Sequence, residues 1–209
     1  MNRPCPLRFL ARPAFGLWAM VIAWAFAASA FAAPVAPDEQ VRRVSGEVIA
    51  ILKSDPNILA NPAKLRELIE SKLLPNFNFT RMTQLAMGRN WARATAEQQA
   101  ALTREFQTLL VRTYSGALAN FRNNTIEIRP LRVQPTDTEV TVRTQVMQPN
   151  GQGIPIDYAM EKLPDGRWQA YDVTVGGVSL VTNYRDEFNT VVRDQGVDAL
   201  IRQLQSRNR

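Results

Sequence analysis

The hydrophobic pattern of the chain changes its period at Asn123, and this change restricts the folds that the chain can adopt. Before Asn123, apolar residues recur at spacings of three and four, which is typical of amphipathic helices. From there to about residue 175, isoleucines and valines alternate with polar residues, which is typical of half-buried strands. Helical spacing returns after Gly177. Helices therefore flank one block of strands on both sides, and this order predicts an α+β fold with helices covering one face of the sheet.

Capping residues place the helices that precede the strands. Asn61 followed by Pro62 is typical of a helix start, and so is Thr95 with Gln98 three residues later. Gly88 is typical of a helix end. These signals, together with the apolar spacing, predict helices over 37–53, from 62 to before Pro75, over a short segment ending at Gly88 and over 96–121. One more helix is predicted before Gly196 and one after it.

Turn sequences divide the block of strands. "PNGQG" and "PDG" are typical of turns between antiparallel strands, and they predict a four-stranded antiparallel meander. Strict alternation then assigns each side chain to one face of the sheet. Tyr171, Val173 and Val175 are expected on the face that the helices cover, and Asp172 is expected on the opposite face with Trp168.

The N-terminus has the three parts of a secretory signal peptide. Arg3, Arg8 and Arg12 give a positive start, an apolar run follows, and "ASAFAA" supplies small residues at its end. The run is too short to span a bilayer of roughly 30 Å, so we expect cleavage after Ala32 rather than a membrane anchor. Cys5 precedes the run, whereas a lipid-modified cysteine would sit at the cleavage point. The expected parts are a signal peptide over 1–32 and one domain over 33–209, mainly helical over 33–123, with strands over 124–175 and helices over 178–208.

Residue counts exclude several kinds of chemistry in the chain without its signal peptide. The whole chain has no histidine and its one cysteine is Cys5, so Ser-His-Asp catalysis, Cys-His catalysis, disulfides and the usual zinc ligands are excluded. The net charge of +6 falls to +3, because 22 basic residues (25 less the three arginines that leave) remain against 19 acidic ones. The remaining basic residues form no stripe with interleaved aromatic residues, so no nucleic-acid partner is expected. These counts favour binding over catalysis.

Three acidic residues and a double glycine are candidate sites. Asp157, Glu161 and Asp172 lie on neighbouring strands, and a pair of carboxylates can act as acid and base. All three are assigned to the face away from the helices, which favours solvent-side or structural acids bonded to a backbone N–H or an arginine. Gly176 and Gly177 match no phosphate-binding motif, and they favour a corner that needs positive φ.

Large rings and branched apolar side chains share the covered face of the sheet and the helices around it. A soluble domain needs such residues for a dry core. Periodicity does not distinguish a filled core from a lined cavity, so both interpretations stay open at this point.

Two longer stretches resemble a known protein family. They are "LLPNFNFTRMTQLAMGRNWARATAEQQAALTREFQTLLVRTYSGAL" and "RWQAYDVTVGGVSLVTNYRDEFNTVVRDQGVDALIRQLQ". Both are similar to the MlaC family, the toluene-tolerance proteins of Gram-negative bacteria, and the resemblance extends from about Val41 to Leu204. Its most specific parts are Leu74-Pro75, the helix over 95–118, the strand over 168–172 and the corner over 177–180.

The resemblance implies a soluble periplasmic phospholipid carrier without cofactor, metal or catalytic residue. It implies a twisted sheet of NTF2-like character wrapped by N- and C-terminal helices, with a deep apolar pocket between them. The pocket would take both acyl chains of a diacyl phospholipid and leave the head group in solvent. The implied partners are an outer-membrane lipoprotein–porin complex and an inner-membrane ABC transporter with its periplasmic lipid-binding subunit. A monomeric carrier would shuttle lipid between them and maintain outer-membrane asymmetry.

The faces assigned above select the residues expected to line this pocket. They lie on the long helix, on the covered face of the strands and on the helix after Gly177. The lining residues expected from the sequence are Leu110, Tyr114, Leu118, Val142, Val146, Ile156, Tyr158, Met160, Tyr171, Val173, Leu180, Val181, Tyr184 and Phe188. Arg89, Arg93, Arg129 and Arg143 are candidates for docking to the partners.

Two other functions stay open on the sequence alone. An NTF2-like fold also hosts small-molecule enzymes, in which Tyr158, Tyr171 or Asp172 would act inside an apolar pocket. A structural or adaptor role in the cell envelope would need no pocket. Lipid retained through purification would separate a carrier from both alternatives.

Overall fold

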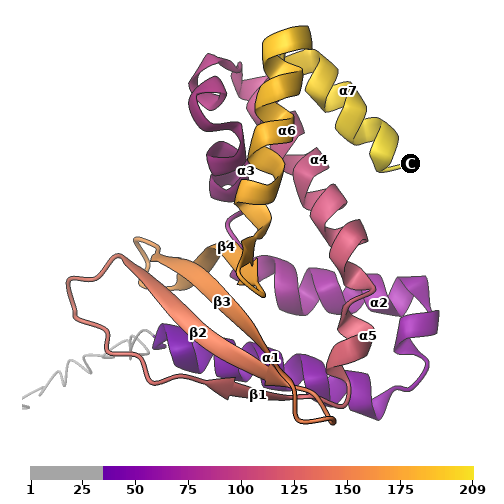
Figure 1. The fold of residues 1–209 in the computed structure, drawn as a ribbon, viewed down its shortest axis with the longest axis vertical. Helices are drawn as coiled ribbons and strands as arrows, with labels where there is room; N and C mark the ends of the chain where they lie inside the picture. The colour runs from indigo at the N-terminus through magenta and orange to yellow at the C-terminus, as the bar shows by residue number, and fades with distance from the viewer. Residues whose placement is uncertain (1–34) are drawn as a thin grey trace, which may run out of the picture. The chain divides into compact units, whose positions relative to one another are not determined.

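The computed structural model describes residues 35–209, apart from the side chains of Ala119 and Asn120. The predicted signal peptide over 1–32 lies outside the described residues. The described part is α+β, and helices precede and follow one antiparallel sheet (Figure 1). This order confirms the class predicted from the change of period. No helix of residues 35–209 is long and apolar enough to cross a membrane.

Residues 35–209 contain eleven helical segments. Most are α-helices, η1, η3 and η4 are 3₁₀-helices, and η2 is a π-helix. Their bounds are α1 Pro37–Ser54, η1 Ile58–Ala60, α2 Pro62–Leu68, η2 Ile69–Leu73, η3 Leu74–Asn76, α3 Phe79–Met87, η4 Gly88–Arg93, α4 Ala96–Ser115, α5 Leu118–Phe121, α6 Leu180–Gln195 and α7 Val197–Arg207.

The helix starts follow the capping residues predicted from the sequence. The Asn61 side chain accepts hydrogen bonds from the first backbone N–H groups of α2. Thr95 and Gln98 form a complete capping box, in which each side chain bonds the other residue's backbone N–H. The predicted helix over 96–121 is wrong in one respect, because it is interrupted after Ser115 and continues as α5.

The sheet has five strands rather than the predicted four. In space they follow chain order, and each strand is antiparallel to its neighbours. The fifth strand is a two-residue segment that the helical pattern had included in the following helix. The bounds are β1 Thr125–Ile128, β2 Glu139–Met147, β3 Gly153–Lys162, β4 Trp168–Val175 and β5 Val178–Ser179.

A bulge in β4 changes which residues face the helices. Ala159 pairs with Asp172 while Met160 pairs with Ala170, so Tyr171 is the extra residue. Trp168, Ala170 and Val173 are therefore all buried on one face. The predicted strict alternation is wrong here, because it separated Trp168 from Val173 and placed Tyr171 on the covered face.

Four α-helices pack into what we call the helical cluster. α3 contacts α4 and α6, and α7 contacts α4 and α6 (Figure 1). The side chains of Phe106 and Phe188 are fully buried in it, with ring centroids 5.1 Å apart and planes at 72°. Such edge-to-face contacts suit the charge distribution of aromatic rings.

Three smaller apolar clusters lie outside the helical cluster. One joins Val41 of α1 to the sheet around Trp168, and a second joins Val48 of α1 to Leu68 of α2. The third lies on the inner face of β2, β3 and β4 around Val146. The domain therefore buries its apolar residues in four clusters with a junction between them.

Candidate functional site

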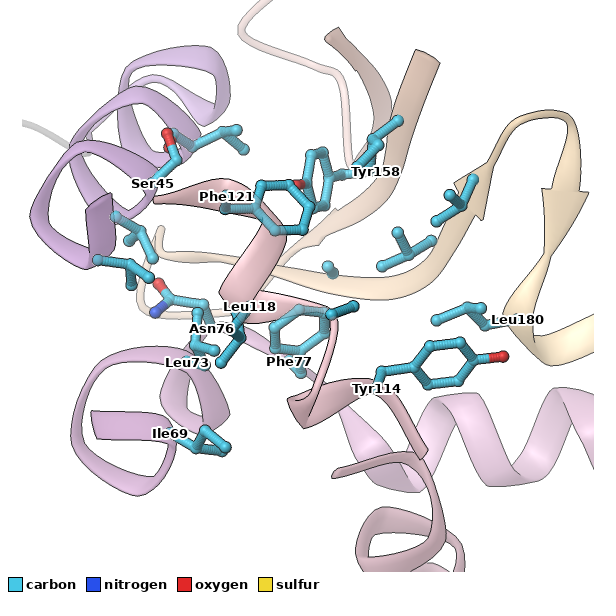
Figure 2. Close-up of a pocket in the computed structure, with 18 of the residues that line it drawn as sticks. Ser45, Ile69, Leu73, Asn76, Phe77, Tyr114, Leu118, Phe121, Tyr158 and Leu180 are labelled. Carbon is cyan, nitrogen blue, oxygen red and sulfur yellow. The ribbon is translucent and has the colours of Figure 1, made fainter. Parts of the chain in front are cut away.

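An apolar cavity of about 460 Å³ lies where the four clusters meet (Figure 2). Each cluster contributes to its wall, for example Leu110 from the helical cluster and Met160, Val48 and Val146 from the other three. The wall thus combines α1, the segment from η2 to α3, α4, α5 and the inner face of the sheet. Ligand sites of roughly 300–1,000 Å³ are typical of proteins that bind small molecules or cofactors.

Phe77 is central to this wall, because it packs against three of the four clusters. Its backbone forms a parallel bridge with Ala170 of β4, and the N–H of Asn78 donates to the Ala170 carbonyl at 2.9 Å. The rings of Phe77 and Phe79 have centroids 5.8 Å apart. The backbone attachment holds an aromatic ring between the helical cluster and the sheet.

The cavity wall has no charged side chain among the residues that the structure describes. Its polar members are Gln40, Ser45, Asn76, Tyr114, Ser115, Asn124, Gln148 and Tyr158. The Gln40 Nε2 donates to Asn76 Oδ1 at 3.0 Å and to the Trp168 carbonyl at 2.8 Å. Both N–H groups of this amide therefore have partners within the protein. Residues 35–209 also contain no group of three or more His, Cys, Asp or Glu that could hold a metal ion. The wall therefore suits an uncharged, apolar ligand.

Tyr158 places a hydroxyl group on the otherwise apolar inner face of β3. It lies on the central strand β3 between Val142 and Val173, and its side chain extends into the cavity on the side of Phe121 (Figure 2). Burial raises the pKa of Tyr158 to about 12. The residue is half-buried and lies in the cavity wall.

Nine of the fourteen residues predicted to line a pocket lie in this wall. They come from the end of α4, from α5, from the inner faces of β2 to β4 and from the start of α6. They are Leu110, Tyr114, Leu118, Val146, Ile156, Tyr158, Met160, Val173 and Leu180.

Four of the other five residues are packed against neighbouring side chains instead. Val181, Tyr184 and Phe188 lie inside the helical cluster, where the rings of Phe106 and Tyr184 have centroids 5.2 Å apart. Val142 is fully buried in the cluster around Trp168. α6 therefore presents only its first residue to the cavity and turns the rest of its apolar face to other helices.

Tyr171 lies on the outer face of the sheet. The Arg81 guanidinium is 3.8 Å from the centre of its ring, and its hydroxyl donates to Glu139 Oε2 at 3.1 Å. Arg81 also bonds Glu139 at 2.6 Å and forms an ion pair with Glu161, which accepts a further hydrogen bond from Asn78 at 2.8 Å. This network ties the start of α3 to three strands, and it accounts for Glu161 as a structural acid.

Most of the wall that sequence reasoning missed comes from the N-terminal half of the chain. The apolar stripe of α1 was visible as spacing, but spacing did not show that the stripe faces a cavity. The segment from η2 to α3 gave no such signal. The apolar wall residues that were missed in these two segments are Val41, Val44, Val48, Ile49, Ile69, Leu73, Leu74, Phe77, Phe79 and Met82.

Asp172 lies outside the cavity wall. Its Oδ1 accepts from the backbone N–H of Val173 at 2.8 Å and of Val181 at 3.1 Å, and its Oδ2 accepts from the Ser179 hydroxyl at 2.5 Å. Gly176 and Gly177, with φ of 58° and 87°, form the turn before β5. The predicted corner is confirmed, and Asp172 is the structural acid that joins it to the start of α6.

The four arginines considered for docking are exposed and form two pairs. Arg129 and Arg143 lie across from each other on the outer face of the sheet, and the Arg129 N–H donates to the Arg143 carbonyl. Arg143 also pairs in register with Asp157 of β3. Arg89 and Arg93 lie on η4, next to the helical cluster. None of the four forms a salt bridge with another residue of 35–209.

Comparison with known protein families gives one match that spans most of the chain. The family model described as "MlaC protein" matches residues 42–206. The chain belongs to the MlaC family. The match begins within α1 and ends in the last turn of α7, so it includes the cavity wall from Val44 to Leu180 and leaves out Gln40 and Val41.

Named relatives and one solved structure agree with this membership. The intermembrane phospholipid transport system binding protein MlaC of Haemophilus influenzae is 26% identical over 156 residues, covering 74% of this chain and 70% of that protein. The toluene tolerance protein ttg2D of Pseudomonas putida is 25% identical over 164 residues, covering 78% and 75%. A phospholipid-binding protein from Ralstonia solanacearum, solved in complex with a phospholipid, is 39% identical. It covers 83% of this chain and 97% of its own, with a TM-score of 0.77.

Proposed function

We propose that this protein is an exported carrier that binds a diacyl phospholipid with both acyl chains in the apolar cavity and the head group outside. The observation that carries the proposal is the wall of the cavity, which is apolar, draws on four clusters and has no charged side chain among the described residues. The Ralstonia solanacearum structure supports it, because a similar fold there holds a phospholipid. Binding of this kind needs shape and apolar surface and no catalytic group.

The energetics are favourable for such a ligand. Two acyl chains have about 30 methylenes, and at roughly 0.8 kcal/mol for each the gross transfer term is about 24 kcal/mol. Lost translational and conformational freedom reduces this term considerably. A phosphate inside the cavity would lack a counter-charge, which supports a head group that stays in solvent.

The carrier would work in the periplasm, between an outer-membrane lipoprotein–porin complex and an inner-membrane ABC transporter with its periplasmic lipid-binding subunit. The signal-peptide pattern of residues 1–32 and the transport system named for the Haemophilus influenzae relative support this assignment. Lipid exchange between these partners would maintain the asymmetry of the outer membrane.

The carrier function is tested by the mass of the protein as purified from a Gram-negative host. Native mass spectrometry and organic extraction should show one diacyl phospholipid for each folded chain. A bare polypeptide mass would contradict the proposal and favour an adaptor. A small polar molecule in place of lipid would favour an enzyme.

Docking would involve the two arginine pairs. Two like charges that lie opposite each other on a sheet repel, and an acidic surface on a partner would relieve this repulsion at Arg129 and Arg143. Reversal of each arginine to glutamate should slow lipid transfer to the inner-membrane partner and weaken its salt dependence. Arg202→Glu, an equal charge change at an exposed position on α7, is the matched control. Equal transfer rates in all variants would remove these arginines from the docking surface.

A further inference from the structure

The Tyr158 hydroxyl is a hydrogen-bond donor inside an apolar cavity. On the inner face of β3 it lies among Ile154, Ile156 and Met160, and it is the polar member of that row. No group within residues 35–209 makes a hydrogen bond with it, and burial is the cause of its raised pKa. Because Tyr158 lines the cavity and its hydroxyl has no partner in the described residues, a molecule in the cavity is the partner that this donor can take, which points to a ligand.

The other tyrosines differ from Tyr158 in their surroundings. The Tyr171 hydroxyl bonds Glu139 on the outer face of the sheet. Burial and then the neighbouring Tyr184 raise the pKa of Tyr114, whereas burial alone raises that of Tyr158. A phenylalanine at 158 would fill the same space against Val142 and Val173 without a polar atom. Packing alone therefore does not account for the hydroxyl.

The chemistry of the wall restricts the acceptor. A phosphate or carboxylate beside Tyr158 would be a buried charge, and the described wall has no lysine or arginine to balance it. Hydrocarbon offers no acceptor at all. The uncharged acceptor that a diacyl lipid brings next to its chains is the carbonyl oxygen of an acyl ester.

We infer that Tyr158 donates a hydrogen bond to an ester carbonyl of the bound lipid and thereby makes the site selective for acyl esters over ether-linked chains. This inference rests on the proposed function. The hydroxyl fixes how far the ester end of the lipid enters the cavity, while the apolar wall binds the chains without regard to their linkage.

Two phospholipids that differ only in their linkage provide the test. Delipidated protein is offered a diacyl phosphatidylglycerol and its dialkyl ether analogue, with equal chains, in direct competition. The wild type should prefer the ester roughly fivefold, the factor that corresponds to about 1 kcal/mol for one hydrogen bond. Tyr158→Phe should bind both equally. Tyr171→Phe, which removes a hydroxyl on the other face of the sheet, should keep the preference.

Each outcome decides a different question. Equal binding by the wild type, or an unchanged preference in Tyr158→Phe, would overturn the role of Tyr158 and leave the carrier function standing. Failure of the wild type to bind either lipid would instead overturn the proposed function.

A second measurement needs no variant. Infrared spectra of a lipid with ¹³C-labelled ester carbonyls should show a carbonyl band shifted to lower frequency on binding to the wild type. An unshifted ester band would also overturn the inference.

Discussion

The carboxylate of Asp172 accepts a hydrogen bond from the backbone N–H of Val181 across 3.1 Å, and this bond joins the end of β4 to the first turn of α6. The same carboxylate also bonds Val173 and Ser179. The first N–H groups of a helix have no partner within the helix, and an anion there also matches the helix dipole. Asp172 therefore stabilises the corner between the sheet and the helical cluster.

Asp172→Ala should lower the free energy of unfolding by about 1–3 kcal/mol, because it leaves half-buried N–H groups without an acceptor. Urea denaturation followed by circular dichroism measures the change. Asp172→Asn should lose less, since one oxygen acceptor remains. Lipid bound per folded molecule should be unchanged in both variants, and a selective loss of lipid at full stability would instead assign Asp172 to the ligand site.

Val173→Glu should give a folded protein with at least about tenfold less bound lipid. Val173 lies in the cavity wall, and a carboxylate there would be desolvated by an acyl chain at a cost of several kcal/mol. Mass spectrometry of lipid extracts measures the loss. Thr174→Glu, the next position on the same strand and outside the wall, should retain lipid. Equal lipid in Val173→Glu and the wild type would contradict this cavity as the ligand site.

Tyr184→Ala should act on stability and not on lipid binding. Tyr184 packs against Phe106 and Phe188 within the helical cluster, and removing its ring leaves a cavity among buried side chains. The expected loss is about 3 kcal/mol in the free energy of unfolding. Lipid per folded molecule should match the wild type, so a folded Tyr184→Ala without lipid would place this residue at the ligand site after all.

Arg81→Ala should weaken the attachment of α3 to the outer face of the sheet. Its guanidinium bonds Glu139 and Glu161 and covers the ring of Tyr171. Hydrogen bonds to charged groups that are partly buried contribute about 2 kcal/mol, and this loss is expected in urea denaturation. Arg167→Ala, which breaks an exposed pair with Asp165, should change stability by less than about 1 kcal/mol. Equal effects of the two variants would contradict the role of the network.

Stability at alkaline pH should depend on Tyr158. Its pKa of about 12 in the folded protein exceeds the value of about 10 for an unfolded chain, so the fold favours the neutral phenol. The contribution is complete below pH 10 and is lost as the pH rises towards 12. By pH 11 the wild type should have lost about 1.4 kcal/mol that Tyr158→Phe retains. Unfolding free energies of both proteins at pH 9 and pH 11 provide the measurement, and parallel losses would contradict burial of the hydroxyl.

Signals that act over three or four residues were sufficient to predict the starts of α2 and α4. Asn61 and Thr95 cap α2 and α4 as their local sequences predicted, because capping depends on atoms within one helical turn. The positive φ at Gly176 and Gly177 is equally local. The α+β order followed from the change of period alone.

Tyr171 is a residue whose position local sequence signals predicted wrongly. Alternation assigned it to the cavity, but β4 also pairs with Phe77, from a distant part of the chain, and a bulge moves Tyr171 to the outer face. Val41 and Val48 show a second limit. Their spacing marks an apolar stripe, and only the assembled fold shows that the stripe borders a cavity rather than a filled core.

The meeting of four clusters at one cavity has a consequence for the turnover of the protein. A ligand held there would contact segments from α1 to α6 at once and would stabilise all of them by mass action. The empty form would open more often and expose more cleavage sites to proteases. Proteolysis would then remove the empty form faster than the loaded one, so the abundance of the protein would follow the supply of its ligand.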